Sequence, residues 1–143
     1  MSENLIVVGV DGSESALKAA KVAHALAGAL GASLHVVTAF DSDRVQVASS
    51  GSETWVHSDA DSAEGVAKAV AATLQQLAPE QTVRYTAARG KPAEALINVA
   101  ERYQATMIVV GNRRMQGLGR VLGSVANSVA HNAPCDVYIA KTH

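Results

Sequence analysis

A glycine- and arginine-rich segment is the part of this sequence whose residue types and spacing could do chemistry. Residues 111–124 read GNRRMQGLGRVLGS, with four glycines, three arginines and a serine. They follow the apolar run TMIVV and precede VANSVAHN, which has helical spacing. A helix N-terminus offers unpaired N–H groups and a partial positive charge, so a glycine-rich connection leading into a helix can bind a phosphate. The segment therefore indicates a phosphate site, the alternative being a flexible turn with solvated arginines.

The residue types inside the segment suit an anion, but they do not match the best-known phosphate motifs. Gly123 would let the backbone approach closely, the Ser124 hydroxyl adds a donor, and charge comes from Arg113, Arg114 and Arg120. The pattern is not GxxxxGK[ST], which excludes a P-loop NTPase. No GxGxxG follows the first apolar run directly, which argues against a dinucleotide-binding domain.

The elements that must position this segment alternate along the chain. Five apolar runs predict strands: Leu5–Val10, Leu34–Phe40, Thr82–Ala88, Thr106–Val110 and Asp136–Ala140. Four segments with helical spacing lie between them, with apolar stripes over 17–30, 60–77, 92–103 and 125–131. This alternation predicts an α/β fold with a parallel sheet wrapped by helices. Residues 41–59, which contain Trp55, are expected to form one long polar connection that serves as a lid, a binding loop or a mobile segment.

Ligands of an open parallel sheet bind beyond the carboxyl ends of the strands, where the strand order reverses. The first strand delivers GVDGSE there, and the fourth delivers the glycine-rich segment. If these strands are neighbours, Asp11 faces the segment across one crevice. A carboxylate would repel a bare phosphate, so Asp11 is expected to address ribose hydroxyls or a bridging Mg²⁺.

Bulk composition narrows the class of protein. The 143 residues fit one domain, 1–143, and a net charge of −1 gives no reason to expect binding to nucleic acid or to a membrane surface. The single cysteine, Cys135, excludes an internal disulfide and is expected to be a small core residue. The five histidines lack metal-ligand spacing, so no metal site of the chain's own is expected. The start lacks the basic and apolar pattern of a signal peptide, and the expected location is cytoplasmic.

Four stretches of the chain resemble the universal stress protein family from end to end. They are IVVGVDGSESALKAAKVAHALA, LHVVTAF, GKPAEALI and MIVVGNRRMQGLGRVLGSVANSVAHNAPCDVYIAKT. The resemblance implies a five-stranded, all-parallel, Rossmann-like sheet of order 3-2-1-4-5 with four flanking helices. Nucleotide-binding members carry Gly, two residues, Gly, nine residues, then Gly and Ser or Thr. Gly111 fits the first position, and Gly123 with Ser124 fits the last. Arg114 replaces the second glycine, and only eight residues separate it from Gly123.

The resemblance also implies which residues contact a nucleotide. Adenine and ribose contacts fall on Gly9, Val10, Asp11 and Ala39. Phosphate contacts fall on the glycine-rich segment and the start of the next helix, at Gly111, Asn112, Arg113, Arg114, Gly123, Ser124 and Val125.

The expected function is that of a stress-response protein that binds ATP or cyclic AMP and acts as a sensor or nucleotide-gated partner. No obvious base is present to activate a water, so hydrolysis of the nucleotide is expected to be slow or absent. An adenylyl-transferring synthetase is not expected, because such an enzyme would need HIGH-like or SGGxDS-like motifs, which the chain lacks. By resemblance, the chain forms a homodimer through its fifth strand, Asp136–Ala140. The alternative is a dimeric interaction module that binds no nucleotide: Arg114 and the shortened segment favour it, whereas Asp11 and Gly123–Ser124 do not.

Overall fold

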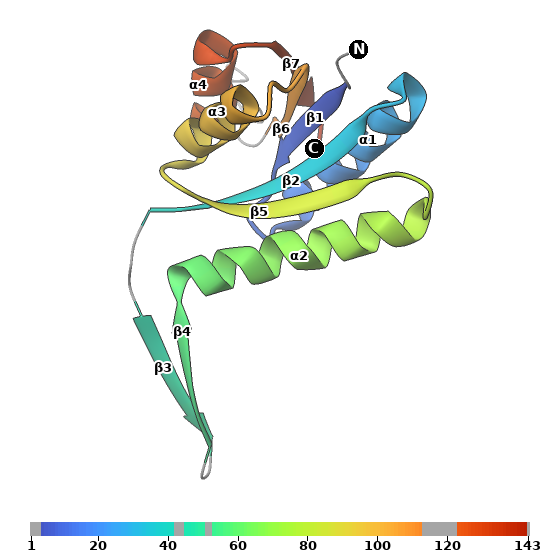
Figure 1. The fold of residues 1–143 in the computed structure, drawn as a ribbon. Coiled ribbons are helices and arrows are strands. Elements are labelled where there is room, and N and C mark those ends of the chain that lie inside the picture. Colours follow the sequence, from blue (N-terminus) through green and yellow to red (C-terminus); the bar gives the residue numbers. More distant parts are fainter. Residues whose placement is uncertain (1–3, 42–44, 51–52, 113–122, 143) are drawn as a thin grey trace.

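The computed structural model describes residues 4–41, 45–50, 53–112 and 123–142. Its main sheet has five parallel strands in the order β5-β2-β1-β6-β7 (Figure 1). Their bounds are β1 Leu5–Gly9, β2 Ser33–Phe40, β5 Val83–Arg89, β6 Met107–Gly111 and β7 Asp136–Ala140. Numbered by themselves, these strands run 3-2-1-4-5, so the predicted order is confirmed. The continuously apolar strands β1 and β6 lie at the centre, where both faces of the sheet are covered.

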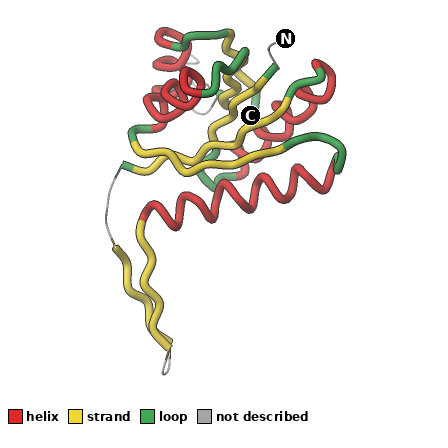
Figure 2. Tube along the Cα trace, in the orientation of Figure 1, coloured by secondary structure: helices red, strands yellow, loops and turns green. Residues whose placement is uncertain are grey.

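Four helices cover the two faces of the sheet, as Figure 2 shows in red against the yellow strands. They are α1 Glu14–Leu30, α2 Asp59–Leu77, α3 Pro92–Arg102 and α4 Ser124–Asn132. Helices α1 and α2 share one apolar cluster with the sheet, and α3 and α4 share the other. Among the described residues, no helix combines the length and the hydropathy needed to cross a membrane.

The helix ends follow from local sequence chemistry. The Ser13 hydroxyl accepts a hydrogen bond from the Ala16 N–H at the start of α1, and Gly31 ends that helix with φ 65°. Ser58 and Asp61 form a reciprocal capping box at the start of α2. Pro92 occupies the first turn of α3, where its missing N–H costs nothing. Ser13, Gly31 and Pro92 therefore set the ends of these helices.

Three large side chains that the helical stripes predict to face inward are exposed instead. Leu30 is 51% exposed, Leu77 61% and Tyr103 44%. Leu30 and Leu77 are the last residues of α1 and α2, and Tyr103 is the C-cap of α3. A periodic pattern continues to the end of a helix, but the sheet beneath does not, so the prediction was wrong at these ends. The buried face of α3 is formed by Ala95, Leu96, Val99 and Ala100.

The expected polar connection over 41–59 contains a second, two-stranded sheet. Strands β3 (Val45–Ser50) and β4 (Glu53–Ser58) pair antiparallel, with Val47 opposite Val56. The hairpin projects from the body next to the start of α2 (Figures 1 and 2). The sequence reading missed it because short β-branched and aromatic stretches are interrupted by serines. The side chain of Trp55, which lies within this connection, is outside the described part of the structure.

Candidate functional site

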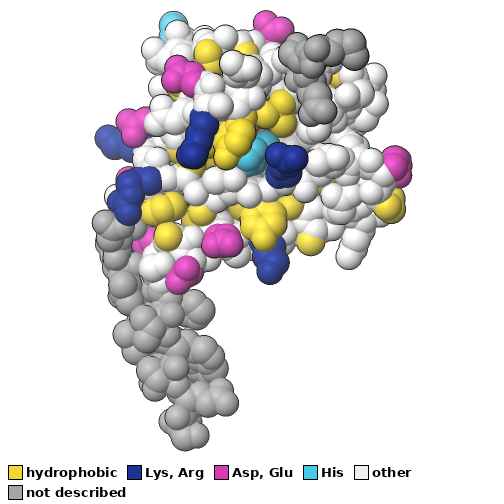
Figure 3. All heavy atoms as spheres, in the orientation of Figure 1, with side chains coloured by type: hydrophobic (Ala, Val, Ile, Leu, Met, Phe, Trp, Pro, Cys, Tyr) yellow, Lys and Arg dark blue, Asp and Glu magenta, His cyan; other side chains and the backbone are white. Residues whose placement is uncertain are grey.

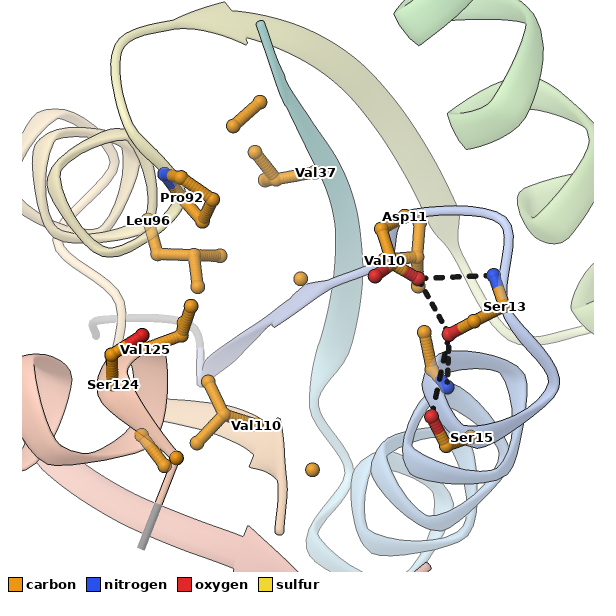
Figure 4. Close-up of a pocket in the computed structure, with 16 residues that line it drawn as sticks. Val10, Asp11, Ser13, Ser15, Val37, Pro92, Leu96, Val110, Ser124 and Val125 are labelled. Carbon is orange, nitrogen blue, oxygen red and sulfur yellow. Dashed lines mark hydrogen bonds between the residues drawn. The ribbon is translucent and has the colours of Figure 1, made fainter. Parts of the chain in front are cut away.

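A cavity of about 340 Å³ opens at the carboxyl end of the sheet, between the ends of β1 and β6. The loop after β1, the end of β2 and the first turns of α1, α3 and α4 all contribute to its wall (Figure 4). Its volume falls within the usual range of small-molecule sites. Strands β1 and β6 are neighbours, so the crevice lies at the reversal of strand order, where the sequence placed it.

The structure brings together most of the residues that the sequence analysis assigned to a nucleotide. Eight of them line the cavity: Gly9, Val10, Asp11, Ala39, Gly111, Gly123, Ser124 and Val125. Arg113 and Arg114 lie outside the described residues. Asn112 does not line the cavity; its buried side-chain oxygen accepts hydrogen bonds from the Thr142 N–H at 2.7 Å and hydroxyl at 2.9 Å. Asn112 therefore ties the end of β6 to the residues that follow β7.

The sequence analysis missed half of the cavity wall. The additional lining residues are Ser13, Ser15, Ala16, Val37, Pro92, Leu96, Val110 and Ala126. Two signals could have found some of them. Val37 shares a strand face with Ala39, two residues away, and Leu96 follows Pro92 by one helical turn. The rest depend on how close the first turns of α1 and α4 come to the cavity, which no local pattern encodes.

The polar side of the cavity is a hydrogen-bonded cluster at the start of α1. One oxygen of Asp11 accepts from the Ser13 N–H at 3.0 Å and from its hydroxyl at 2.6 Å. The Ser13 and Ser15 hydroxyls lie 3.3 Å apart. This turn holds the carboxylate in a defined position, and the adjacent helix N-terminus favours its negative charge (Figure 4). Asp11 and the serine hydroxyls can together address the hydroxyl groups of a ligand.

The opposite side of the cavity is apolar. It is lined by Val37, Pro92, Leu96, Val110 and Val125 (Figure 4). A Cβ built on Gly9 would lie 2.9 Å from a terminal carbon of Leu96, so the glycine leaves the room that Leu96 fills. The result is a wall of aliphatic carbon against which a flat ring can pack.

Helix α4 begins at the cavity without the side-chain cap that α1 and α2 have. Its N-cap is Gly123, which makes no side-chain capping bond, and its first turn has no acidic residue. The serine hydroxyls at the starts of α1 and α2 each accept a hydrogen bond from a first-turn N–H group, whereas Gly123 has no side chain that could do so at the start of α4. Ser124 adds an exposed hydroxyl at the same point. The start of α4 is therefore suited to an anionic group of a ligand.

Ionisable groups are scarce in the described wall of the cavity, where Asp11 alone carries one. Cys135 lies apart, partly buried against the α3–α4 cluster, and burial together with Asp136 raises the pKa of its thiol. A raised pKa disfavours the thiolate, which argues against a nucleophilic role. On the face seen in Figure 3, cationic and acidic side chains are interspersed, with no broad field of one sign.

A family model described as the universal stress protein family matches residues 4–141. A universal stress protein of Thermus aquaticus is 34% identical over 137 residues, 95% of this chain and 97% of the relative. One of Mycobacterium tuberculosis is 30% identical over 96% of this chain and 95% of its own. The solved structure described as a universal stress protein in complex with cAMP is 27% identical, covers both chains fully and superposes with a TM-score of 0.76. The resemblance of the sequence is thus confirmed, and the chain belongs to the universal stress protein family.

Proposed function

We propose that this stress protein binds an adenine nucleotide, ATP or cyclic AMP, in the cavity at the carboxyl ends of β1 and β6. The observation that carries the proposal is the start of α4, whose N-cap Gly123 makes no side-chain capping bond and which lies across one aliphatic-walled cavity from the fixed carboxylate of Asp11. A nucleotide has three chemically different parts, and the cavity offers a surface for each. The relative solved with cAMP supports the same ligand class.

In the proposed arrangement, each part of the nucleotide meets the surface that suits it. The phosphate lies at the N–H groups that open α4, next to the Ser124 hydroxyl. The ribose hydroxyls donate to Asp11, whose position Ser13 fixes. The base packs on the aliphatic wall that includes Leu96, which the absence of a side chain on Gly9 allows to lie there, and the small side chain of Ala39 leaves space beside it.

Magnesium fits this site only as part of a magnesium–nucleotide complex. Mg²⁺ is usually held by one or two carboxylates together with substrate phosphates. The described wall supplies one carboxylate, and the described residues contain no group of three or more His, Cys, Asp or Glu that could hold a metal. Asp11 would then contact the ion while the phosphates supply its other oxygen ligands, so Mg²⁺ without nucleotide is not expected to bind.

The proposed role is nucleotide binding in the cytoplasm, as a sensor or nucleotide-gated partner, with hydrolysis slow or absent. Asp11 is engaged by Ser13, and the described wall holds no histidine, lysine or cysteine that could activate a water. Homodimerisation through β7 belongs to the same proposal. That strand is at the edge of the sheet, and its Tyr138 is 43% exposed.

A matched pair of charge substitutions on α4 tests the site. Ser124→Glu adds a carboxylate where the phosphate is proposed to lie, while the helix dipole favours that charge and keeps the fold stable. Ala130→Glu adds the same charge at an exposed position further along the helix. We expect calorimetric titration to show at least tenfold weaker binding of ATP or cyclic AMP for Ser124→Glu and little change for Ala130→Glu. Equal affinities in both variants would place the phosphate elsewhere.

The alternative is an interaction module that binds no nucleotide, favoured by Arg114 and the shortened glycine segment. Arg114→Gly separates the possibilities. If the arginine contacts phosphate, the substitution weakens binding; if it occupies the phosphate position, the substitution strengthens binding. An unmeasurable affinity in both the native chain and Arg114→Gly would favour the interaction module.

A further inference from the structure

One polar side chain in the described wall of the cavity has no role in the arrangement proposed above. The polar side chains of that wall belong to Asp11, Ser13, Ser15 and Ser124. Asp11 is proposed to meet the ribose and Ser124 the phosphate, while Ser13 holds Asp11 in position. Ser15 remains: it is half-buried, it is the second residue of α1, and it lines the cavity beside Ser13 (Figure 4).

The hydrogen bonds of this cluster show which atoms donate. The Ser13 Oγ lies 2.6 Å from an oxygen of Asp11, and a carboxylate has no proton to donate, so Ser13 donates its only hydroxyl proton there. The Ser13 Oγ also accepts a hydrogen bond from the Ala16 N–H at 3.1 Å. In the 3.3 Å contact between the Ser13 and Ser15 hydroxyls, Ser15 must therefore be the donor.

This direction makes Ser15 an acceptor toward the cavity. A hydroxyl has one proton and two lone pairs, so a ligand meets only lone pairs while the Ser15 proton points at Ser13. The carboxylate of Asp11 likewise accepts and does not donate. Ser13 contacts both groups, so the two acceptors lie close together on one side of the cavity (Figure 4). This side of the cavity is complementary to two adjacent donor groups.

The chain itself fixes the positions of these acceptors. Gly12 has a φ of 88°, which glycine adopts without strain, and this turn lets the Ser13 N–H reach back to the Asp11 side chain at 3.0 Å. Ser13 is also the N-cap of α1, so the cluster is tied to the helix. A site built to hydrogen-bond a ligand hydroxyl discriminates strongly against an analogue that lacks it.

We propose that Asp11 and Ser15 select nucleotides whose ribose has both its 2′ and 3′ hydroxyls, such as ATP, over deoxynucleotides and 3′,5′-cyclic AMP. The proposal rests on nucleotide binding in this cavity. The two ribose hydroxyls are adjacent donors that can bond to both acceptors at once. In cyclic AMP the 3′ oxygen is esterified to the phosphate and has no proton, so one of the two acceptors receives no hydrogen bond from the sugar.

Calorimetric titration with ATP, 2′-deoxyATP and 3′-deoxyATP tests this selection, because each analogue lacks one hydroxyl. The native chain is expected to bind ATP roughly tenfold more tightly than either analogue, the effect of one hydrogen bond. Ser15→Ala should remove the preference for ATP over one analogue and keep the preference over the other, whose missing hydroxyl faces Asp11. The control Ser62→Ala, at an exposed position in the first turn of α2, should keep both preferences.

A second comparison addresses cyclic AMP directly. The 5′-methyl ester of AMP has one negative charge, as cyclic AMP does, but keeps both ribose hydroxyls. The native chain is expected to bind this ester roughly tenfold more tightly than cyclic AMP.

The outcomes separate this inference from nucleotide binding itself. Three results would overturn the selection while ATP binding stands: equal affinities for ATP and its two analogues, cyclic AMP binding as tightly as the methyl ester, or both preferences surviving in Ser15→Ala. If the native chain binds none of these nucleotides, the proposed function is wrong, and the selection falls with it.

Discussion

At the scale of single residues, the contact between Gly9 and Leu96 sets the room in the cavity. A methyl group on Gly9 would lie 2.9 Å from the end of the Leu96 side chain. That side chain is flexible, so Gly9→Ala is expected to cost only about 1 kcal/mol, the low end of over-packing penalties. The displaced side chain should narrow the cavity and weaken nucleotide binding about tenfold, as calorimetric titration would show.

The matched control for Gly9→Ala is Gly28→Ala on α1. An added Cβ there would meet the Gln81 side chain at 3.7 Å, an ordinary contact. Alanine favours the helix, so Gly28→Ala is expected to stabilise the chain by about 0.5–1 kcal/mol in urea unfolding, with unchanged binding. Loss of binding in both variants would contradict the assignment of Gly9 to the cavity.

Protonation of His35 is expected to make the stability of the fold depend on pH. Burial and then the charge of Arg84 lower the pKa of His35 below its ordinary value of 6.5. As the pH falls, the unfolded chain therefore binds the proton first, and the free energy of unfolding decreases below about pH 6.5. A single titrating group can change the free energy of unfolding by at most about 1.4 kcal/mol per pH unit. Urea unfolding from pH 8 to pH 5 would show the decrease.

His35→Gln provides the comparison for the pH series. The imidazole Nε2 of His35 lies 2.6 Å from the Thr86 hydroxyl, a contact that an amide can also make. The variant should lose the component of the pH dependence that His35 supplies. An identical pH dependence in both proteins would show that His35 does not contribute to it.

At the scale of elements, substitutions at the N-caps of α1 and α2 distinguish an effect on stability from an effect on nucleotide binding. Ser13→Ala and Ser58→Ala each remove an N-cap, and each should cost about 1 kcal/mol of unfolding free energy. Only Ser13 also donates a hydroxyl hydrogen bond to Asp11. Ser13→Ala should therefore weaken nucleotide binding several-fold while Ser58→Ala does not. Equal binding in the two variants would contradict the proposed role of Asp11.

The sequence predicted the central elements better than the ends of helices. The continuous apolar runs of β1 and β6 and the capping signals at Ser13, Gly31 and Pro92 are local, so local patterns locate them. The exposure of Leu30 depends on where the sheet stops, which is a property of the tertiary structure. The β3–β4 hairpin was missed because its alternation is short and broken by serines.

In the candidate site too, some residues could be predicted from the sequence and others could not. Asp11 and Gly123–Ser124 could be assigned because they follow strands whose order was predicted correctly. Leu96 and Pro92 enter the cavity from α3, whose approach depends on packing against Gly9 and the sheet. Asn112 was assigned to the ligand by its position in the motif, yet the structure uses its side chain to hold Thr142.

At the scale of the whole molecule, nucleotide binding should stabilise the fold. A ligand that binds only the folded chain raises the free energy of unfolding by about 2.7 kcal/mol when it is present at 100 times its dissociation constant. Thermal unfolding should therefore shift upward by several degrees with saturating nucleotide. Ser124→Glu should show a smaller shift at the same concentration, and Ala130→Glu the full shift.

The most direct test of nucleotide binding is a calorimetric titration of the native protein with Mg-ATP and with cyclic AMP. A portion of the protein is first denatured to detect any nucleotide that copurifies. The account predicts saturable binding of at least one of the two ligands near one site per chain, or nucleotide released on denaturation. The absence of both heat and released nucleotide would contradict it, and would indicate that the cavity between β1 and β6 does not accept a nucleotide in this chain.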